Sequence, residues 1–402
     1  MTIADRVDRF GGWAAVAIGA SIPVSVALDN VLLAACLAAW LLGGSYREKL
    51  EAARGNVVLL AALALFALLA AGTAWSHGAP GDALRYLAKY SDLLLVAPLA
   101  HLLREPPVRM RALRAFAASL GIVLLLSCLI KTGLLPSGRW WLGDSRNAVV
   151  FKYHLTHNIL MAYGAFLFAE LALAARTVRA RALMAAAALL AVANVLFMVQ
   201  GRTGYLVLAA LALYFGYRLH GRRGLAASAA ASAAIVITLA LAPGTFGERW
   251  QALASELRAW NAAIPSHTST GLRLEFYRNT LAIIRDHPLL GVGTGGFPKA
   301  YEDRVSGTGV AETRNPHNEY LHIAVQLGLP GLALLLFLFH VQWRNAPRLP
   351  STIETHLARG LVLTMVVGCL FNSMLLDHTE GLMFAWLTAT LFTGLPPAES
   401  GN

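Results

Sequence analysis

Charged residues are scarce in this sequence. Only 14% of its 402 residues are Asp, Glu, Lys or Arg, whereas 57% are hydrophobic, and the mean hydropathy is +0.57. The surface of a soluble domain needs considerably more charge than this. The scarcity excludes a soluble globular protein, and no stretch of the sequence resembles a soluble folded domain.

Cysteine is almost absent as well. The three that occur, Cys36, Cys128 and Cys369, each fall inside an apolar run. Three thiols in such surroundings give no disulfide framework, and their spacing does not match a zinc site. We therefore expect neither disulfide-dependent folding nor a bound metal, and we expect no cofactor.

Long apolar runs, in contrast, are abundant. A helix that crosses a bilayer needs about 20 predominantly apolar residues, and the stretches 56–75 and 182–199 meet this requirement. The first run, at about 10–28, could pass for a signal peptide, but we interpret it as an uncleaved span because it completes the charge pattern described next. We predict an all-α polytopic membrane protein of about twelve spans, at approximately 10–28, 30–44, 56–75, 86–103, 112–131, 155–175, 182–200, 203–218, 224–242, 329–345, 356–373 and 379–395.

The loops between these spans alternate in charge. One set, which includes ARTVRARA and RLHGRRG, is short and rich in arginine, and such an excess marks the cytoplasmic side of a membrane protein. Both termini are therefore predicted to be cytoplasmic. The formal net charge of +11 follows mostly from this bias, so it implies orientation and anionic lipid rather than nucleic acid.

This alternation divides the chain into three parts. We predict nine spans in residues 1–242, a large outward loop with short helices in residues 243–328, and three spans with a short cytoplasmic tail in residues 329–402. The outward loop is expected to contribute part of the functional site.

Basic residues on the outward side oppose the rule that sets the topology, so they are informative. Each could simply reach toward lipid headgroups. So many together favour a cationic pocket at the outer interface that binds an anionic headgroup such as phosphate or pyrophosphate. The residues concerned are Arg85, Lys89, Lys131, Arg139, Arg146, Lys152, Arg202, Arg273 and Arg278.

Two of these arginines stand out as phosphate ligands. Arg202 lies at the tip of a predicted helical hairpin with no acidic residue nearby in sequence, and Arg273 shares a helical face with Tyr277 and also lacks a partner. Arg278, in contrast, follows Glu275 by three residues and could form an ion pair within its helix. The glycines at 291, 293, 295 and 296 resemble a phosphate loop only superficially, and we predict a flexible turn over the site.

A polar segment at 314–319 leads into an apolar helix. We predict that Asn315 caps this helix, which places His317 in its first turn, near the positive end of the helix dipole. The dipole and neighbouring arginines disfavour the imidazolium, so a neutral His317 can accept a proton as a general base. Asn318 or Glu319 could orient the ring or a substrate hydroxyl. The alternative is a capping histidine hydrogen-bonded to the loop.

Two further polar clusters are predicted to face outward. His154 and His157 follow Lys152 and share one helical face. A polar substrate contact or a structural role is favoured there over a metal site, because no further ligands lie close in sequence. Asp377, in the last outward turn, could hold arginines in place or meet a polar acceptor, and His322 is interpreted as structural.

These motifs resemble the O-antigen ligase and polymerase superfamily of bacterial inner membranes. GRTGYLVL, GLRLEFYRNTLAIIRDHPLLGVGTGGF and RNPHNEYLHIAVQLGLPGL occur in the matching order, and the twelve spans and the large loop before the tenth also agree. The resemblance implies a fold like that of class C glycosyltransferases. It also matches His317 to the essential histidine of the family, and Arg202 and Arg273 to its essential arginines. Position 201 is glycine here, where many relatives have serine.

For a ligase, the resemblance implies metal-independent transfer of a glycan from undecaprenyl pyrophosphate to a hydroxyl of the lipid A–core oligosaccharide, at the periplasmic face. We expect the transfer to invert the anomeric centre. The predicted substrate-binding residues are Arg85, Lys89, Arg139, Arg146, Lys152, His154, Arg278, Asn315, Asn318 and Asp377. The alternatives are an O-antigen polymerase, a protein O-oligosaccharyltransferase of the same superfamily, a transporter of an anionic lipid or sugar, and a non-catalytic scaffold.

Overall fold

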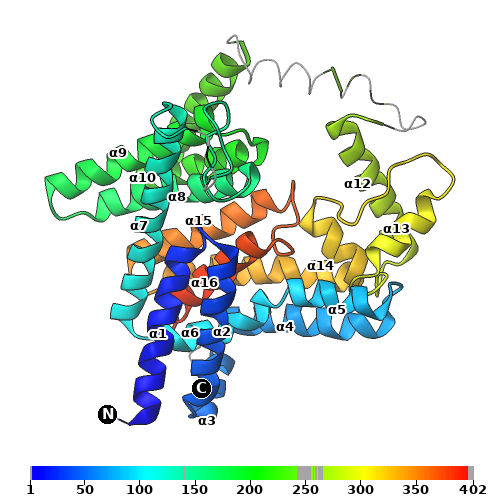
Figure 1. Ribbon diagram of the computed structural model, residues 1–402, viewed down its shortest axis with the longest axis horizontal. Helices are drawn as coiled ribbons and strands as arrows, with labels where there is room; N and C mark the ends of the chain where they lie inside the picture. The colour runs from blue at the N-terminus through cyan, green and yellow to red at the C-terminus, as the bar shows by residue number, and fades with distance from the viewer. Residues whose placement is uncertain are drawn as a thin grey trace.

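The computed structural model describes residues 2–136, 138, 141–241 and 266–396, together with residues 255, 256, 258 and 260. The named elements of these residues are all helices (Figure 1). The first half of the chain forms α1 (Ile3–Ser21), α2 (Val26–Leu42), α3 (Tyr46–Arg54), α4 (Val57–Gly72), α5 (Pro80–Lys89), α6 (Asp92–Leu102), α7 (Pro106–Lys131), α8 (His154–Ala174) and α9 (Val178–Ala193). The second half forms α10 (Arg202–Leu241), α12 (Ser269–Asp286), α13 (Phe297–Val305), α14 (Glu319–Asn345), α15 (Thr352–Gly368) and α16 (His378–Phe392).

Several of these helices are long and apolar enough to cross a membrane, as a helical membrane protein requires. Five candidate spans meet this test among the described residues, at Val57–Trp75, Pro106–Lys131, His154–Ala174, Val178–Met198 and Glu319–Arg348. A sixth would combine α2 and α3, which meet at a bend of 112°. The count of twelve, the periplasmic loop and the likeness to class C glycosyltransferases stay predictions.

The helix ends differ from the predicted spans at two places. The predicted turn at residues 29–30 was wrong, because α1 already ends at Ser21 and Asp29 lies buried in the first turn of α2. The predicted span 86–103 is interrupted at Tyr90 and Ser91, so that Lys89 ends a separate short helix, α5. The boundary predicted between 218 and 224 is confirmed by a break in α10 at residues 220–221.

The centre of the bundle is α16, in which every residue from Thr379 to Phe392 is buried (Figure 1). It packs against α4, α6, α7 and α15. Its Trp386 indole donates a hydrogen bond to the carbonyl oxygen of Ala15 at 2.8 Å, and a Cβ at Gly19 would lie 2.5 Å from the same ring. Glycine at position 19 therefore permits the close approach of α1 to the central helix.

The two ends of α16 define two ends of the bundle. At the end that contains His378, the hydroxyl of Ser21 hydrogen-bonds Asp29, whose Oδ2 lies 3.8 Å from Nε2 of His378. At the other end, the Thr393 hydroxyl donates to the carbonyl oxygen of Ala100 in α6 at 2.8 Å. We refer to these as the His378 end and the Thr393 end, and α1 runs from the second to the first.

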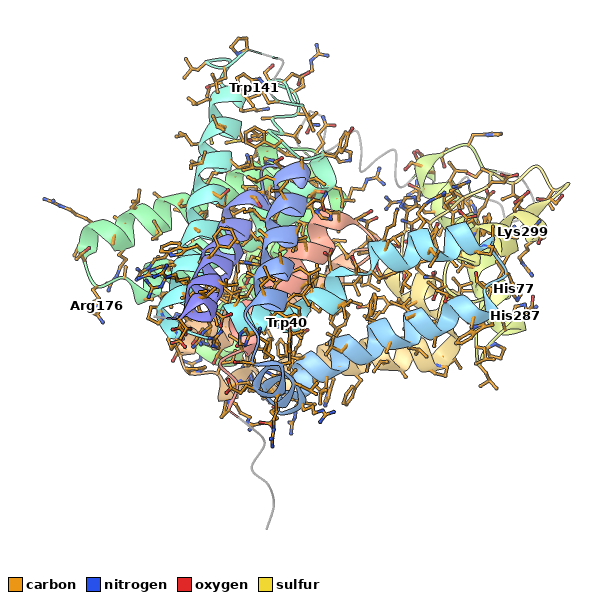
Figure 2. All side chains as sticks on the ribbon, turned by 60° about the horizontal axis from the view of Figure 1, so that its bottom comes forward. Trp40, His77, Trp141, Arg176, His287 and Lys299 are labelled. Atoms are coloured by element: carbon orange, nitrogen blue, oxygen red, sulfur yellow. The ribbon has the colours of Figure 1, made fainter. Side chains whose placement is uncertain are left out.

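A glycine-rich segment, residues 291–296, connects α12 to α13 and packs between α4 and α14. The backbone N–H of Gly293, which has φ of +79°, donates to the carbonyl oxygen of Gln326 at 2.9 Å, and that of Thr294 donates to Gly72 at 3.0 Å. The segment is buried and bonded on both sides, so the prediction of a flexible turn over the site was wrong. Nearby, the rings of His77 and His287 meet edge to face at 5.2 Å (Figure 2).

Within α14 the helix breaks at Gly328. This residue has φ of +66° and ψ of −167°, and a Cβ there would lie 2.4 Å from the carbonyl oxygen of Leu289. Only glycine occupies such a conformation readily. The prediction that Gly328, Pro330 and Gly331 break this helix is confirmed at the first of these residues, and residues 319–327 form a short helical segment of their own.

Candidate functional site

The loop before α14 ends in His317 and Asn318. Asn318 is the N-cap, because its Oδ1 accepts a hydrogen bond from the backbone N–H of Leu321 at 3.0 Å, and the helix begins at Glu319. The prediction that Asn315 caps the helix was therefore wrong by three residues. His317 lies just outside the helix rather than in its first turn.

The backbone of His317 adopts φ of +56°. Residues other than glycine rarely occupy this region, and doing so costs on the order of 1–3 kcal/mol. Two hydrogen bonds hold it there: Oδ1 of Asn315 accepts from its N–H at 2.8 Å, and the Tyr277 hydroxyl donates to its carbonyl oxygen at 3.2 Å. The Asn315 oxygen also accepts from the Ser373 hydroxyl at 2.7 Å. Residues from α12 and from the turn after α15 thus determine where the His317 ring points.

The ring itself is half-buried against Phe276 of α12, with centroids 6.3 Å apart and planes inclined by 29°. The side chain of Asn372 hydrogen-bonds the ring, and its Nδ2 donates to Oδ2 of Asp377 at 2.8 Å. Because the amino group of Asn372 serves Asp377, its carbonyl oxygen is left to accept the ring N–H. A neutral imidazole carries one N–H and one lone pair, so the other ring nitrogen is free to take a proton.

The surroundings of His317 favour this neutral form. Burial lowers the pKa of the imidazole below its ordinary value, and the guanidinium of Arg273 lowers it further. Asn372 and the carboxylate of Asp377 act in the opposite direction. The predicted influence of an arginine is thus present, although burial is the larger cause.

Lys89 and Asp377 complete this charged neighbourhood. Burial raises the pKa of the Asp377 carboxyl, while the hydrogen bond from Asn372 and the charges of Lys89 and His317 lower it. Lys89 is exposed at the end of α5. The structure therefore brings predicted residues from α5, α12, the loop before α14 and the turn before α16 to one place.

Lys152 is placed differently from the prediction. Its side chain is 7% exposed, its Nζ donates to the Thr379 hydroxyl at 3.1 Å, and the carboxylate of Asp29 lies 3.8 Å away. Burial lowers the pKa of this lysine, and the Asp29 and Glu380 carboxylates oppose that effect. Lys152 was predicted to bind substrate, but in the structure it pairs with Asp29 between α2, α8 and α16.

The two histidines of α8 do not share a site. His154 is exposed at the first position of the helix, whereas His157 is buried, with its Nε2 3.1 Å from Oδ1 of Asn194. His157 therefore has a structural partner, and a substrate contact of His154 stays a prediction. No group of three His, Cys, Asp or Glu side chains in the described part of the chain is arranged to hold a metal ion.

Arg202 is the first residue of α10 and is exposed. The carbonyl oxygen of the preceding Gly201 accepts a hydrogen bond from Asn158 of α8 at 3.3 Å, and Thr156 of the same helix donates to Glu380 of α16 at 2.6 Å. Arg202 therefore begins its helix at the His378 end. Its guanidinium makes no hydrogen bond or ion pair with any residue that the structure describes.

The remaining predicted cations lie on exposed surfaces. Arg85 forms an ion pair with Asp82 one turn earlier at 3.0 Å, and Arg146 and Arg278 are exposed as well. Arg139 lies outside the described residues. The charges that act on His317 come from Arg273 and Asp377 rather than from these residues.

Sequence reasoning missed the residue that orients the histidine. Asn318 and Glu319 were the predicted candidates, but Asn318 caps α14 and donates to the carbonyl oxygen of Leu370 at 3.0 Å. Glu319 is fully buried and accepts from the Tyr90 hydroxyl at 2.9 Å. The role falls to Asn372, whose only signal in the sequence is a polar pair, Asn-Ser, inside an otherwise apolar run.

Comparison with known proteins covers the part of the chain that carries the histidine. Residues 185–336, which include Arg202, Arg273 and His317, match the model of a family described as O-Antigen ligase. An uncharacterized protein of Haemophilus influenzae is 26% identical over 161 residues, which are 37% of this chain and 40% of that relative. The match thus spans less than half of the relative's length. The matched region, with its motifs in the expected order, is thus similar to the O-antigen ligase family.

Proposed function

We propose that this protein is an inverting, metal-independent glycosyltransferase that moves an O-antigen glycan from undecaprenyl pyrophosphate to a hydroxyl of the lipid A–core oligosaccharide. The reaction takes place at the periplasmic face of the bacterial inner membrane, with both termini in the cytoplasm. The single observation that carries the proposal is the arrangement of His317, a half-buried histidine with a lowered pKa, bonded through Asn372 to Asp377 and lying near Arg273.

The chemistry follows from this arrangement. The free ring nitrogen of His317 takes the proton of the acceptor hydroxyl, and the oxygen attacks the anomeric carbon of the donor. The bond from that carbon to the pyrophosphate oxygen breaks, and the leaving group departs with the electron pair. Arg273 and Arg202 stabilise the negative charge that develops on it, and Lys89 contributes a further positive charge. Attack from the face opposite the leaving group inverts the anomeric centre.

The proposed residues have separate tasks. His317 is the base, while Arg202 and Arg273 bind the pyrophosphate. Asn372 and Asp377 position the imidazole, so that Asp377 acts through another residue rather than on the substrate. The buried pair of Lys152 and Asp29 supports the start of α16, where Lys152 donates to the Thr379 hydroxyl. The saccharides extend away from the bilayer and contact the exposed side chains of Arg85, Arg146, His154 and Arg278, together with Arg139. Asn315 and Asn318 shape the loop that carries His317.

A polymerase of the same superfamily is the nearest alternative. Residues 185–336 carry the donor-handling arginines and the histidine, and these serve any transfer from the same lipid-linked donor. The acceptor is what distinguishes the possibilities: lipid A–core for a ligase, a second lipid-linked glycan for a polymerase, and a protein hydroxyl for a protein O-oligosaccharyltransferase. A transporter would place its ionisable groups near the bilayer midplane, whereas His317 lies in the loop that precedes the N-terminus of α14.

The proposal is tested with protein purified in detergent and given an undecaprenyl-pyrophosphate glycan. Rough lipopolysaccharide, a second portion of donor, and an acceptor protein are supplied in separate reactions. We expect transfer to the lipopolysaccharide, unchanged by a chelator. His317→Ala should lower the rate about 10²- to 10⁴-fold, the usual contribution of a general base.

The matched control is His340→Ala, which changes an exposed histidine in the apolar part of α14. Glycan transfer only between donor molecules would reassign the protein as a polymerase. Full activity of the His317→Ala protein would remove the proposed base. A retained anomeric configuration in the product, read by NMR, would contradict the single displacement.

A further inference from the structure

A cavity lies at the Thr393 end of the bundle, away from His317. It has a volume of about 550 Å³ and is lined by the first half of α1, by the turn between α6 and α7 and by the start of α7. About 13 residues of α1 separate Asp8 at this cavity from Ser21 at the His378 end, which corresponds to roughly 20 Å along a helix. The cavity is therefore not part of the proposed glycosyltransferase site.

One wall of the cavity is apolar. It is formed by Gly12, Trp13, Val16, Leu102 and Val108. Trp13 is 54% exposed although it lies in the first helix of a membrane protein. Tryptophan is enriched where a bilayer meets water, so this wall is suited to the part of an acyl chain next to the headgroup.

The rim of the cavity carries both signs of charge. Three guanidinium groups, of Arg9, Arg104 and Arg111, line it together with three carboxylates, of Asp5, Asp8 and Glu105. The formal charges of these six side chains cancel. A cavity built for an anionic ligand would not present three carboxylates, and one built for a simple cation would not present three arginines.

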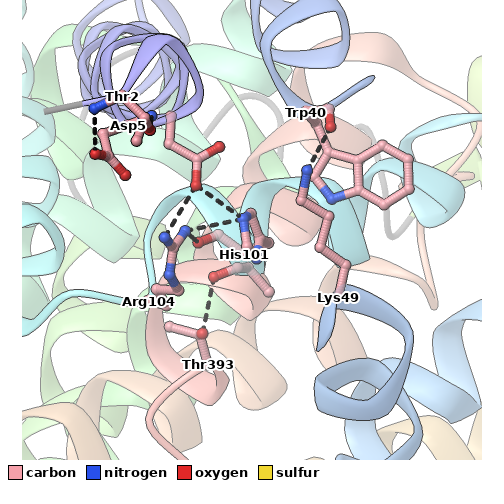
Figure 3. Close-up of polar contacts among 9 residues, drawn as sticks. Thr2, Asp5, Trp40, Lys49, His101, Arg104 and Thr393 are labelled. Carbon is pink, nitrogen blue, oxygen red and sulfur yellow. Dashed lines mark hydrogen bonds and ion pairs between the residues drawn. The ribbon is translucent and has the colours of Figure 1, made fainter. Parts of the chain in front are cut away.

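Two of the arginines are held in defined positions. Arg104 donates to Oδ2 of Asp8 at 3.0 Å, and His101 lies 3.4 Å from the same oxygen (Figure 3). The guanidinium of Arg111 lies over the Trp13 ring, 5.2 Å from its centroid. A guanidinium stacked on an aromatic face keeps its N–H edge available for a phosphate. Arg9 is exposed at the rim.

We propose that this cavity binds a phospholipid whose headgroup carries both a phosphate and a primary ammonium group, as in phosphatidylethanolamine. The phosphate lies between Arg9 and Arg111, and the ammonium group meets the carboxylates of Asp5 and Glu105. The acyl chains run along Trp13 and Val16. Basic pockets between helices at a membrane surface bind lipid headgroups, and the mixed charge of this rim selects a zwitterionic one. Such a lipid links α1 to the start of α7.

The test uses the full-length protein in detergent after removal of bound lipid. Phosphatidylethanolamine or phosphatidylglycerol, which differ in the ammonium group, is added back with identical acyl chains. Binding is followed by native mass spectrometry and by the midpoint of thermal unfolding. We expect phosphatidylethanolamine to bind at least tenfold more tightly than phosphatidylglycerol and to raise the unfolding midpoint.

The double variant Arg9→Gln/Arg111→Gln should lose at least tenfold in affinity for phosphatidylethanolamine. Arg47→Gln is the matched control, since Arg47 is an exposed arginine on α3 that pairs with Glu51 outside the cavity. Glu105→Gln should reduce the ratio of the affinity for phosphatidylethanolamine to that for phosphatidylglycerol, because removing one carboxylate lessens the repulsion of phosphatidylglycerol. Equal binding of both lipids by the unmodified protein, or equal losses in the double variant and the control, would overturn the proposal.

Discussion

The hydroxyl of Tyr277 donates a hydrogen bond to the carbonyl oxygen of His317 across 40 residues of sequence, at 3.2 Å. This bond joins α12, which also carries Arg273, to the loop that carries the proposed base. The bond ties this helix to the loop, and the charge of the arginine acts on the imidazole.

Replacing Arg273 should change the pH dependence of transfer. Since its guanidinium lowers the pKa of His317, Arg273→Gln should raise that pKa. The imidazole is then neutral only above a higher pH, so the acidic limb of the rate profile moves to higher pH. The maximal transfer rate, reached where His317 is fully neutral, also falls because a proposed pyrophosphate ligand is lost. Arg278→Gln, on the same helix but exposed, should leave the limb unmoved; a shift of equal size there would exclude a specific effect of Arg273.

Replacing Asn372 should move the acidic limb of the rate profile to lower pH. The Asn372 side chain raises the pKa of His317, so Asn372→Ala should lower it and extend the neutral form to lower pH. The maximal rate should nevertheless fall, because the ring loses the acceptor that orients it. The measurement is the transfer rate from pH 4 to 8. An upward movement of the limb would show that Asn372 does not accept the ring N–H.

Glycine should be tolerated better than alanine at position 317. The positive φ of His317 costs a residue with a Cβ on the order of 1–3 kcal/mol, and glycine avoids that cost. Both variants lack the base, so stability is compared by unfolding in detergent. At His340, inside α14, the order should reverse, because glycine destabilises a helix interior by about 1 kcal/mol relative to alanine. A more stable His317→Ala protein would contradict the strained backbone.

Removing Lys152 should destabilise the protein rather than weaken substrate binding. Lys152→Met leaves the fully buried Asp29 carboxylate without the lysine, and breaking a buried pair in this way costs about 3–5 kcal/mol. Lys152→Met/Asp29→Leu removes both charges and should recover most of the loss. The unfolding midpoint is the main readout. A stable single variant with an increased KM for the donor would instead restore the original interpretation of Lys152 as a substrate ligand.

Much of the fold was accessible from the sequence because apolar runs and arginine-rich loops follow from the properties of a bilayer. The break in α10 at His220 and Gly221 and the break at Gly328 were visible as local interruptions of helical pattern. The interruption at Tyr90 and Ser91 was missed although Lys89 and Asp92 flank the pair. Its cause is tertiary, since Tyr90 turns inward and its hydroxyl hydrogen-bonds Glu319.

The site was accessible only in part. His317, Arg273 and Asp377 carry chemistry in their side chains, and topology predicts that they share one side of the membrane. Their assembly depends on a backbone conformation at His317 and on an amide, Asn372, that no spacing rule connects to it. Lys152 was misjudged because its partner, Asp29, lies more than a hundred residues earlier.

The break at Gly328 lies between two attachments of α14 to other parts of the chain. Before the break, the Glu319 carboxylate accepts a hydrogen bond from the backbone N–H of Leu375 at 2.8 Å, and after it the backbone N–H of Leu329 donates to the carbonyl oxygen of Pro288 at 2.8 Å. A Cβ at position 328 would lie 2.4 Å from the carbonyl oxygen of Leu289. Any residue larger than glycine would therefore push these two attachments apart and disturb the start of α14, next to His317.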